Sequence, residues 1–207
     1  MFEQPIVMID FETTGLSPAS GDRITEVAAL RIADGRIVER FVSLVNCGVR
    51  IPSFITQLTG ITQDMVDRAP PASAVVPELL QFIGTDALSA HNASFDEKFL
   101  WAESLHMGLY PRHARTICSL KLARRLFPGL PGYKLAMLAS ALGIRFQGSA
   151  HRAEADAEVS AHLLLHVGAH LQKTCGVARI APELLEKINR ISAARVPDFL
   201  AREFAGA

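Results

Sequence analysis

The sequence has few cysteines and lacks any long apolar run. Cys47, Cys118 and Cys175 are odd in number, far apart and without a C-x-x-C pair, so neither a disulfide framework nor a zinc site is expected. No apolar run reaches the roughly 18 residues of a membrane span. Residues 1–5 lack the basic start and apolar stretch of a secretory signal. These absences predict a cytoplasmic protein that does not enter a membrane.

Acidic residues are absent from one quarter of the chain, although the net charge of the whole is zero. Residues 104–153 contain no Asp or Glu, and their basic residues are Arg112, Arg115, Lys121, Arg124, Arg125, Lys134, Arg145 and Arg152. A local basic stripe would suit an anionic polymer such as a nucleic acid. A solvated helix surface would produce the same pattern, and composition alone leaves both interpretations open.

The remaining composition is that of an ordinary globular protein, with 49% hydrophobic and 20% charged residues. The length suffices for one substantial core. We expect one domain over residues 1–175, followed by a helical extension over residues 176–207, interrupted at Pro197. This extension would pack on the domain or contact a partner.

Apolar periodicity and turn signals predict strands followed by a strand–helix alternation. The turn Asp34-Gly35 joins two apolar-rich runs and is a strong hairpin signal. Strands are expected over residues 6–9, 24–33, 36–45 and 86–91, and near 116. Helical pieces are expected over residues 54–58, 63–66, 72–83, 94–106, 134–142 and 152–173, and after the strand near 116. The fold class is α/β, a mixed sheet flanked by helices.

Two carboxylates follow the first predicted strand. Asp10 and Glu12 are two residues apart, so in an extended chain they point to the same face. Like charges this close repel unless a cation lies between them, and carboxylate oxygens suit Mg²⁺ or Mn²⁺. The turn that follows, Thr13-Thr14-Gly15, could bring backbone N–H groups close to a sugar or phosphate. A strand that runs out into a polar surface loop is the alternative.

A third carboxylate, Asp96, lies in the first turn of the helix predicted after a strand. Helix spacing places it beside the apolar Phe99 and Leu100. A ligand site at the carboxyl end of a strand is common in α/β folds. The alternative is an acid favoured by the helix dipole. Asn92, just before this helix, could cap it or contact substrate.

The fourth carboxylate, Asp156, belongs to the inward face of a long helix. It shares that face with Val159, Ser160 and Leu163. An inward carboxylate needs a partner, which a metal ion would supply. His151 precedes the helix after residues 147–150, which we expect to form a loop, and a histidine there could take a proton from water. The opposite helix face, which carries Glu154, Glu158, His162, His166 and His170, is expected to be an exposed polar stripe.

These acidic segments, in this order, resemble the DEDDh (DnaQ-like) 3′–5′ exonuclease superfamily, which includes the proofreading subunit of bacterial replicative polymerase. The resemblance covers about residues 4–172. It rests on Asp10-Phe11-Glu12-Thr13-Thr14-Gly15, Leu58-Thr59-Gly60-Ile61-Thr62, His91-Asn92-Ala93-Ser94-Phe95-Asp96-Glu97-Lys98-Phe99-Leu100, and His151-Arg152-Ala153 with Asp156-Ala157. The histidine at 151, where a sister group has tyrosine, marks the subclass. The resemblance implies an RNase H-like fold with a central mixed sheet of about five strands.

The resemblance also implies roles for the motif residues. Asp10, Glu12, Asp96 and Asp156 would hold two divalent cations, Mg²⁺ or Mn²⁺, and His151 would deprotonate the attacking water. The two cations would lie about 3.5–4 Å apart. Thr13, Thr14, Gly15 and Leu16 would receive the terminal nucleotide, with Asn92 and Phe99 as further substrate-binding candidates.

The implied substrate is single-stranded nucleic acid or a frayed 3′ end, guided by basic residues between 112 and 134 and degraded to nucleoside 5′-monophosphates. DNA is favoured, in proofreading or repair. The alternatives that remain open are an RNA-trimming exoribonuclease, a non-catalytic nucleic-acid-binding module and a phosphatase related to D-x-D-x-T loops, which Glu12 fits poorly. A DNA polymerase subunit or a homodimer partner is also compatible with the sequence.

Overall fold

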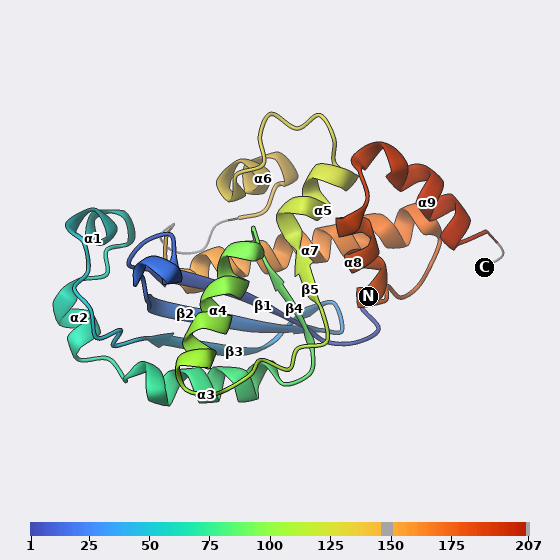
Figure 1. Ribbon diagram of the computed structural model, residues 1–207. Coiled ribbons are helices and arrows are strands. Elements are labelled where there is room, and N and C mark those ends of the chain that lie inside the picture. Colours follow the sequence, from blue (N-terminus) through green and yellow to red (C-terminus); the bar gives the residue numbers. More distant parts are fainter. Residues whose placement is uncertain (146–150, 206–207) are drawn as a thin grey trace.

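A five-stranded mixed sheet forms the centre of the computed structural model, which describes residues 1–145 and 151–205 (Figure 1). The strand order is β3-β2-β1-β4-β5. β1 is antiparallel to β2, which is antiparallel to β3, whereas β4 and β5 run parallel to β1. The strands are β1 (Ile6–Thr13), β2 (Ile24–Ala33), β3 (Arg36–Leu44), β4 (Ala87–Ala90) and β5 (Thr116–Cys118). This mixed sheet confirms the predicted fold class.

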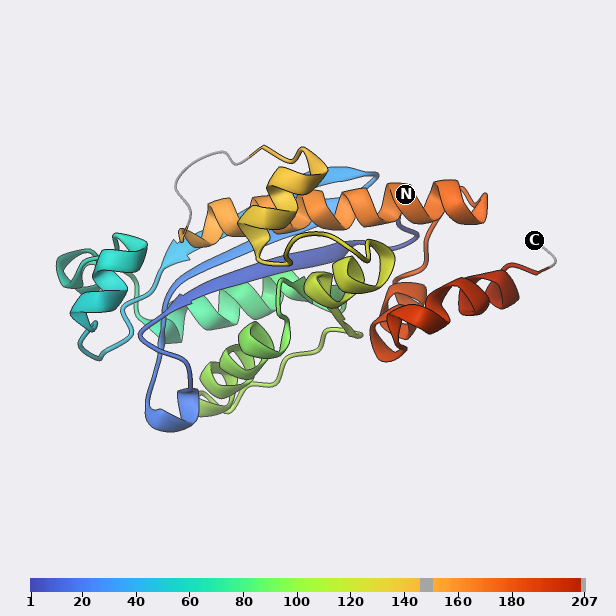
Figure 2. The ribbon, with the colours of Figure 1, turned by 90° about the horizontal axis from the view of Figure 1, so that it is seen from above.

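Helices cover both faces of the sheet (Figure 2). In the described residues the α-helices are α1 (Ser53–Thr59), α2 (Gln63–Asp67), α3 (Ala72–Ile83), α4 (Ser94–His106), α5 (Ser119–Leu126), α6 (Leu135–Leu142), α7 (Ala153–Cys175), α8 (Pro182–Arg190) and α9 (Val196–Glu203). Short 3₁₀ turns lie at η1 (Pro18–Ser20) and η2 (Ala193–Arg195). Among the residues described, no helix combines the length and apolarity needed to cross a membrane.

The alternation of side chains along β1 assigns its two faces. Ile6 and Met8 pack in a core cluster with α7 and α8, whereas Val7 and Ile9 pack in a second cluster with α3 and α4. Because side chains two residues apart share a face, Asp10 and Glu12 continue the Ile6–Met8 row. Both carboxylates therefore emerge on the face that α7 covers.

The long α7 carries the expected two faces. Val159, Ser160 and Leu163 are buried, as predicted for the inward stripe, and Asp156 at its start is partly exposed. On the opposite face Glu154, His162 and His166 are exposed, while Glu158 and His170 are partly covered. The rings of His166 and His170 pack edge-on against Phe127. The polar stripe is thus an outer surface that is partly screened by a neighbouring aromatic side chain.

Most predicted elements lie within two residues of the observed bounds, and three predictions need correction. The strand over residues 24–33 and the helices over 72–83 and 94–106 are confirmed. β1 continues past residue 9 because β2 pairs with it as far as Thr13. Pro197 does not interrupt a helix but lies in the first turn of α9, where its missing N–H leaves no hydrogen bond unmade. Asn92 does not cap α4; Ala93 holds that position.

The segment after Cys175 packs on the same core. Leu184, Leu185 and Ile188 of α8 are buried in the cluster beneath α7. Asn189 Oδ1 accepts a hydrogen bond from the N–H of Cys118 at 2.6 Å, and Asn189 Nδ2 donates one to the Cys118 carbonyl at 3.1 Å. Asn189 therefore takes the place of a neighbouring strand at the free edge of β5.

Candidate active site

Three carboxylates converge where α7 begins beside β1. Asp10 and Glu12 extend from β1, and Asp156 extends from the first turns of α7. One oxygen from each of these carboxylates lies within 4.8 Å of the other two. In the portion of the chain that the structure describes, this is the one such group of three potential metal ligands. The group joins residues that are 146 positions apart in the sequence.

Asp96 approaches β1 from the opposite face. It is buried in the first turn of α4, and its Oδ1 accepts the N–H of Phe11 at 3.2 Å. β4 pairs with β1 only as far as Met8, so the Asp96 carboxylate serves a β1 N–H beyond that pairing. Phe11 lies between Asp10 and Glu12. The predicted fourth carboxylate therefore lies next to the other three, although outside their tight group.

The electrostatics show that this group is short of positive charge. Burial, followed by repulsion from Asp96, Asp156 and other carboxylates, raises the pKa of Asp10 well above its ordinary value. Burial and the neighbouring carboxylates raise the pKa of Glu12 to about 7, and burial raises the pKa of Asp96 to about 8. Burial also raises the pKa of Asp156. Crowded oxygen ligands with such unfavourable ionisation match the donor set of a hard divalent cation.

His151 lies next to Asp156 through its main chain. Its N–H donates to Asp156 Oδ2 at 3.3 Å, its backbone is left-handed with φ of 62°, and its side chain is exposed. Residues 147–150, predicted as the loop leading to it, lie outside the described residues. The main chain of His151 thus lies at the edge of the carboxylate group.

The loop after β1 is held by its own hydrogen bonds. Thr13 Oγ1 donates to the Gly15 carbonyl at 2.6 Å, and Thr14 Oγ1 accepts the N–H of Arg23 at 3.0 Å. A Cβ on Gly15 would lie 2.4 Å from the Asp22 carboxylate, which accepts the N–H of Ser17, so a larger residue would displace this contact. Leu16, at the end of the loop, is 78% exposed. Leu16 is therefore exposed at the end of a loop whose first residues are fixed by hydrogen bonds.

Two of the predicted substrate contacts differ in exposure. Asn92 is exposed and adopts a left-handed backbone with φ of 70°, which turns the chain from β4 into α4. Phe99, by contrast, is fully buried, next to Phe95 in the core. Phe99 presents no surface to a ligand because its helix turns it inward. Lys98 Nζ lies over both rings and donates to the Leu16 carbonyl, which links α4 to the loop.

The predicted basic stripe is partly neutralised within the fold. Arg115 forms ion pairs with Glu183 and Glu186 of α8, and Arg125 donates to the carbonyls of Lys121 and Ile191. Glu183 and Glu186 belong to the C-terminal segment, so the charge count over residues 104–153 did not include them. The stretch is therefore not a continuous row of free cations.

Two buried ion pairs and two exposed apolar side chains were not anticipated from the sequence. Glu26 and Glu103 are buried carboxylates that form ion pairs with Arg152 and Arg23. A signal existed for each, because Glu26 interrupts an apolar strand and Glu103 lies two turns after Asp96 on the same helix face.

On α1, Phe54 and Leu58 are 60% and 52% exposed. Figures 1 and 2 both place α1 at the end of the sheet where β1 finishes and α7 begins.

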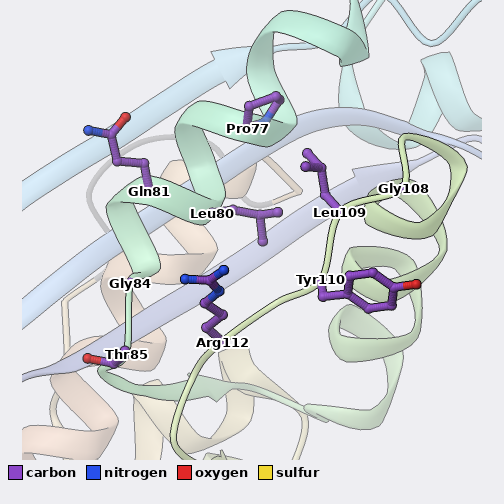
Figure 3. Close-up of a pocket in the computed structure, with 9 residues that line it drawn as sticks. All are labelled: Pro77, Leu80, Gln81, Gly84, Thr85, Gly108, Leu109, Tyr110 and Arg112. Carbon is purple, nitrogen blue, oxygen red and sulfur yellow. The ribbon is translucent and has the colours of Figure 1, made fainter.

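A hollow lies between α3 and the segment that follows α4 (Figure 3). It has a volume of about 490 Å³ and is lined by Pro77, Leu80, Gln81, Gly84, Thr85, Gly108, Leu109, Tyr110 and Arg112. Gly84 and Thr85 lie just before the start of β4, whereas Asp10 and Glu12 lie in the carboxyl-terminal half of β1. The lining contains no carboxylate, so the hollow lacks the ligands that a hard cation needs.

Comparison with known proteins finds exonucleases. The exonuclease family model RNase_T matches residues 7–164. The chain is 40% identical over 167 residues to the 3′-5′ exonuclease DinG of Bacillus subtilis, covering 81% of this chain but 18% of DinG. It is 34% identical to the DNA polymerase III subunit epsilon of Aquifex aeolicus, covering 81% of this chain and 82% of that protein. The chain thus spans most of the epsilon subunit, but only 18% of DinG and 11% of a PolC-type DNA polymerase III of Clostridium perfringens that is also similar to it.

A solved structure gives the same result in three dimensions. Exonuclease X in complex with 5′ overhanging duplex DNA superposes with a TM-score of 0.69 at 30% sequence identity, covering 89% of this chain and 99% of that one. This likeness confirms the predicted RNase H-like fold.

Proposed function

The chain belongs to the exonuclease family, and from this premise we propose that it is a divalent-metal-dependent 3′–5′ exonuclease. It hydrolyses the last phosphodiester bond at a free 3′ end and releases nucleoside 5′-monophosphates. The observation that supports this proposal most strongly is the convergence of Asp10, Glu12 and Asp156, whose carboxylate oxygens lie within 4.8 Å of one another. A non-catalytic binding module has no need of carboxylates whose pKa values are raised by crowding.

The carboxylates would hold the cations. Asp10, Glu12 and Asp156 would hold a Mg²⁺ or Mn²⁺ pair, with Asp96 next to them. Bound divalent cations supply an activated water and charge stabilisation for phosphoryl chemistry. Asp96 is buried and the other three carboxylates are partly buried, so the surrounding fold keeps their oxygens in place before substrate arrives.

His151 would act as the general base. Its place beside Asp156, at the exposed entrance to the carboxylate group, suits a side chain that accepts a proton from water and passes it to solvent. Its left-handed backbone, with φ of 62°, turns the chain just before α7.

The surface around the carboxylates suits an unpaired strand. Leu16, Phe54 and Leu58 are exposed apolar side chains on segments at this end of the molecule. The Phe54 ring could stack with a base irrespective of sequence, and the two leucines offer apolar contact. Thr13, Thr14 and Gly15 would receive the terminal nucleotide through the backbone, and Asn92 is a further candidate for this contact.

DNA is the favoured substrate, because the proteins similar to this chain include a DNA polymerase subunit and an exonuclease solved in complex with duplex DNA. The same similarity favours a role in proofreading or repair, with a polymerase as partner. RNA trimming is the second candidate. Purified protein with single-stranded DNA, mismatched duplex DNA and short RNA distinguishes the two. We expect faster trimming of the mismatched than of the paired end, since a frayed end costs less to separate.

The test of the activity is nucleotide release in Mg²⁺. Wild-type protein is expected to release 5′-monophosphates from a 3′ end, and Asp10→Ala to be slower by about a thousandfold or more, because metal stabilisation is worth several kcal/mol. Asp64→Ala is the matched control, since Asp64 is exposed and pairs only with Arg68 one turn away. Equal release by wild type and Asp10→Ala would contradict the proposal.

A further inference from the structure

Glu26 is a buried carboxylate directly beside the proposed metal site. It lies on β2 opposite Glu12 of β1 and is 3% exposed. On the same strand Ala28 and Leu30 belong to the core cluster beneath α7, so Glu26 points to that face as well. The apolar strand thus places one more carboxylate next to a group that already lacks positive charge.

The carboxylate of Glu26 is fully occupied by the start of α7. Arg152 Nε lies 3.2 Å from Oε1 and 3.1 Å from Oε2, and Arg152 Nη2 lies 2.5 Å from Oε1. The N–H of Ala153 donates to Oε2 at 2.9 Å. Arg152, at the N-cap position, makes no side-chain cap of its own, so Glu26 supplies the acceptor that the helix end needs.

This contact fixes two functional candidates at once. Arg152 lies between His151 and the helix that carries Asp156, and His151 N–H is itself bonded to Asp156. An ion pair from β2 to residue 152 therefore sets how closely the first turn of α7 approaches β1. Charge-assisted, bidentate contacts of this kind have a strongly preferred geometry.

We propose that the Glu26–Arg152 ion pair is a positioning device for the metal site. It holds the start of α7 so that Asp156 and His151 face Asp10 and Glu12, and Arg152 neutralises Glu26 so that this carboxylate stays out of the metal's own ligand set. The inference rests on the proposed function, because it concerns how the same site is built.

A merely structural ion pair is the competing explanation, and the chain contains a matched control for it. Glu103 is 2% exposed and forms a bidentate pair with Arg23, at 2.7 and 2.8 Å. This pair joins α4 to the start of β2 and does not involve α7. Substitution of either glutamate removes one buried charge pair, but only Glu26 acts on Asp156.

The test measures Mn²⁺ affinity by electron paramagnetic resonance and, separately, the melting temperature of metal-free protein. Glu26→Gln keeps an oxygen for the Ala153 N–H but loses the charge. It is expected to weaken Mn²⁺ binding about tenfold, the usual effect of losing a partner that orients a metal ligand. Glu103→Gln is expected to lower the melting temperature similarly while keeping Mn²⁺ affinity within about twofold of wild type.

A conservative variant keeps the test informative if Glu26→Gln folds poorly. Glu26→Asp retains the charge and is expected to recover most of the Mn²⁺ affinity that Glu26→Gln loses, which loss of packing alone does not explain. Wild-type affinity in Glu26→Gln, or equal losses in Glu26→Gln and Glu103→Gln, would overturn the positioning role alone. Failure of wild-type protein to bind Mn²⁺ would instead overturn the proposed function and this inference with it.

Discussion

At the scale of residues, the carboxylates of the site lie where a fold optimised only for stability would not place them. Burial and mutual repulsion raise the pKa values of Asp10, Glu12, Asp96 and Asp156. Each must be ionised to bind a cation, and ionisation at neutral pH is unfavourable in the metal-free protein. The site therefore carries a stability cost that cation binding offsets.

That cost predicts an unusual pH dependence. Because the folded-state pKa of Glu12 is raised from its ordinary 4.5 to about 7, the folded protein holds protons more tightly than the unfolded chain between these values. The stabilisation that Glu12 provides by binding a proton more tightly in the folded state is fully present below about pH 4.5 and is lost as the pH rises through about 7. Asp96 extends this loss to about pH 8.

We therefore expect metal-free protein in EDTA to melt at a lower temperature near pH 8 than near pH 5. The free energy of unfolding should be lower at pH 8 by about 1 kcal/mol or more for each such carboxylate. Saturating Mg²⁺ should reduce or reverse the difference, since bound cations favour the ionised carboxylates. Differential scanning fluorimetry at both pH values measures this. Glu12→Gln should show a smaller pH dependence; an unchanged one would contradict the assignment to Glu12.

At the scale of elements, local sequence patterns predicted what local geometry controls. The alternation along β1 was sufficient to place Asp10 and Glu12 on one face, and helix spacing was sufficient to turn Asp156 inward. Contacts between distant segments were beyond such patterns. Glu26 and Arg152 are 126 residues apart, and the acids that pair with Arg115 lie on α8, so neither pairing has a local signal. Phe99 was expected to contact substrate from the family resemblance alone, which carries no information on its burial in this chain.

Asn189 of α8 provides a prediction at this scale. Its side chain bonds both main-chain polar groups of Cys118 and is almost fully buried. Asn189→Ala leaves two buried groups without partners, which we expect to cost about 2–4 kcal/mol in urea unfolding. Arg190→Ala, at the exposed next position of the same helix, is the control and should change stability by less than about 0.5 kcal/mol. A small effect of Asn189→Ala would mean that β5 is held by other contacts.

At the scale of the whole molecule, the C-terminal segment is packed as part of the core rather than as a free arm. Buried side chains of α8 and α9 join the cluster beneath α7, and Ile180 forms a bridge with Phe2.

We propose that the folding unit extends past the expected boundary at residue 175. A protein ending at residue 175 should then unfold without a cooperative transition and be cleaved rapidly by protease, whereas one ending at residue 203 should behave like the full chain. Cooperative unfolding of the shorter chain would restore the boundary at residue 175.

The central claim is that residues from β1 and α7 form one cation site, and anomalous X-ray scattering from crystals soaked in Mn²⁺ tests it directly. The account predicts an anomalous peak about 2 Å from carboxylate oxygens of Asp10, Glu12 and Asp156, which is lost in crystals of Asp10→Asn. Bound Mn²⁺ only at other positions, with these three carboxylates unliganded, would contradict it.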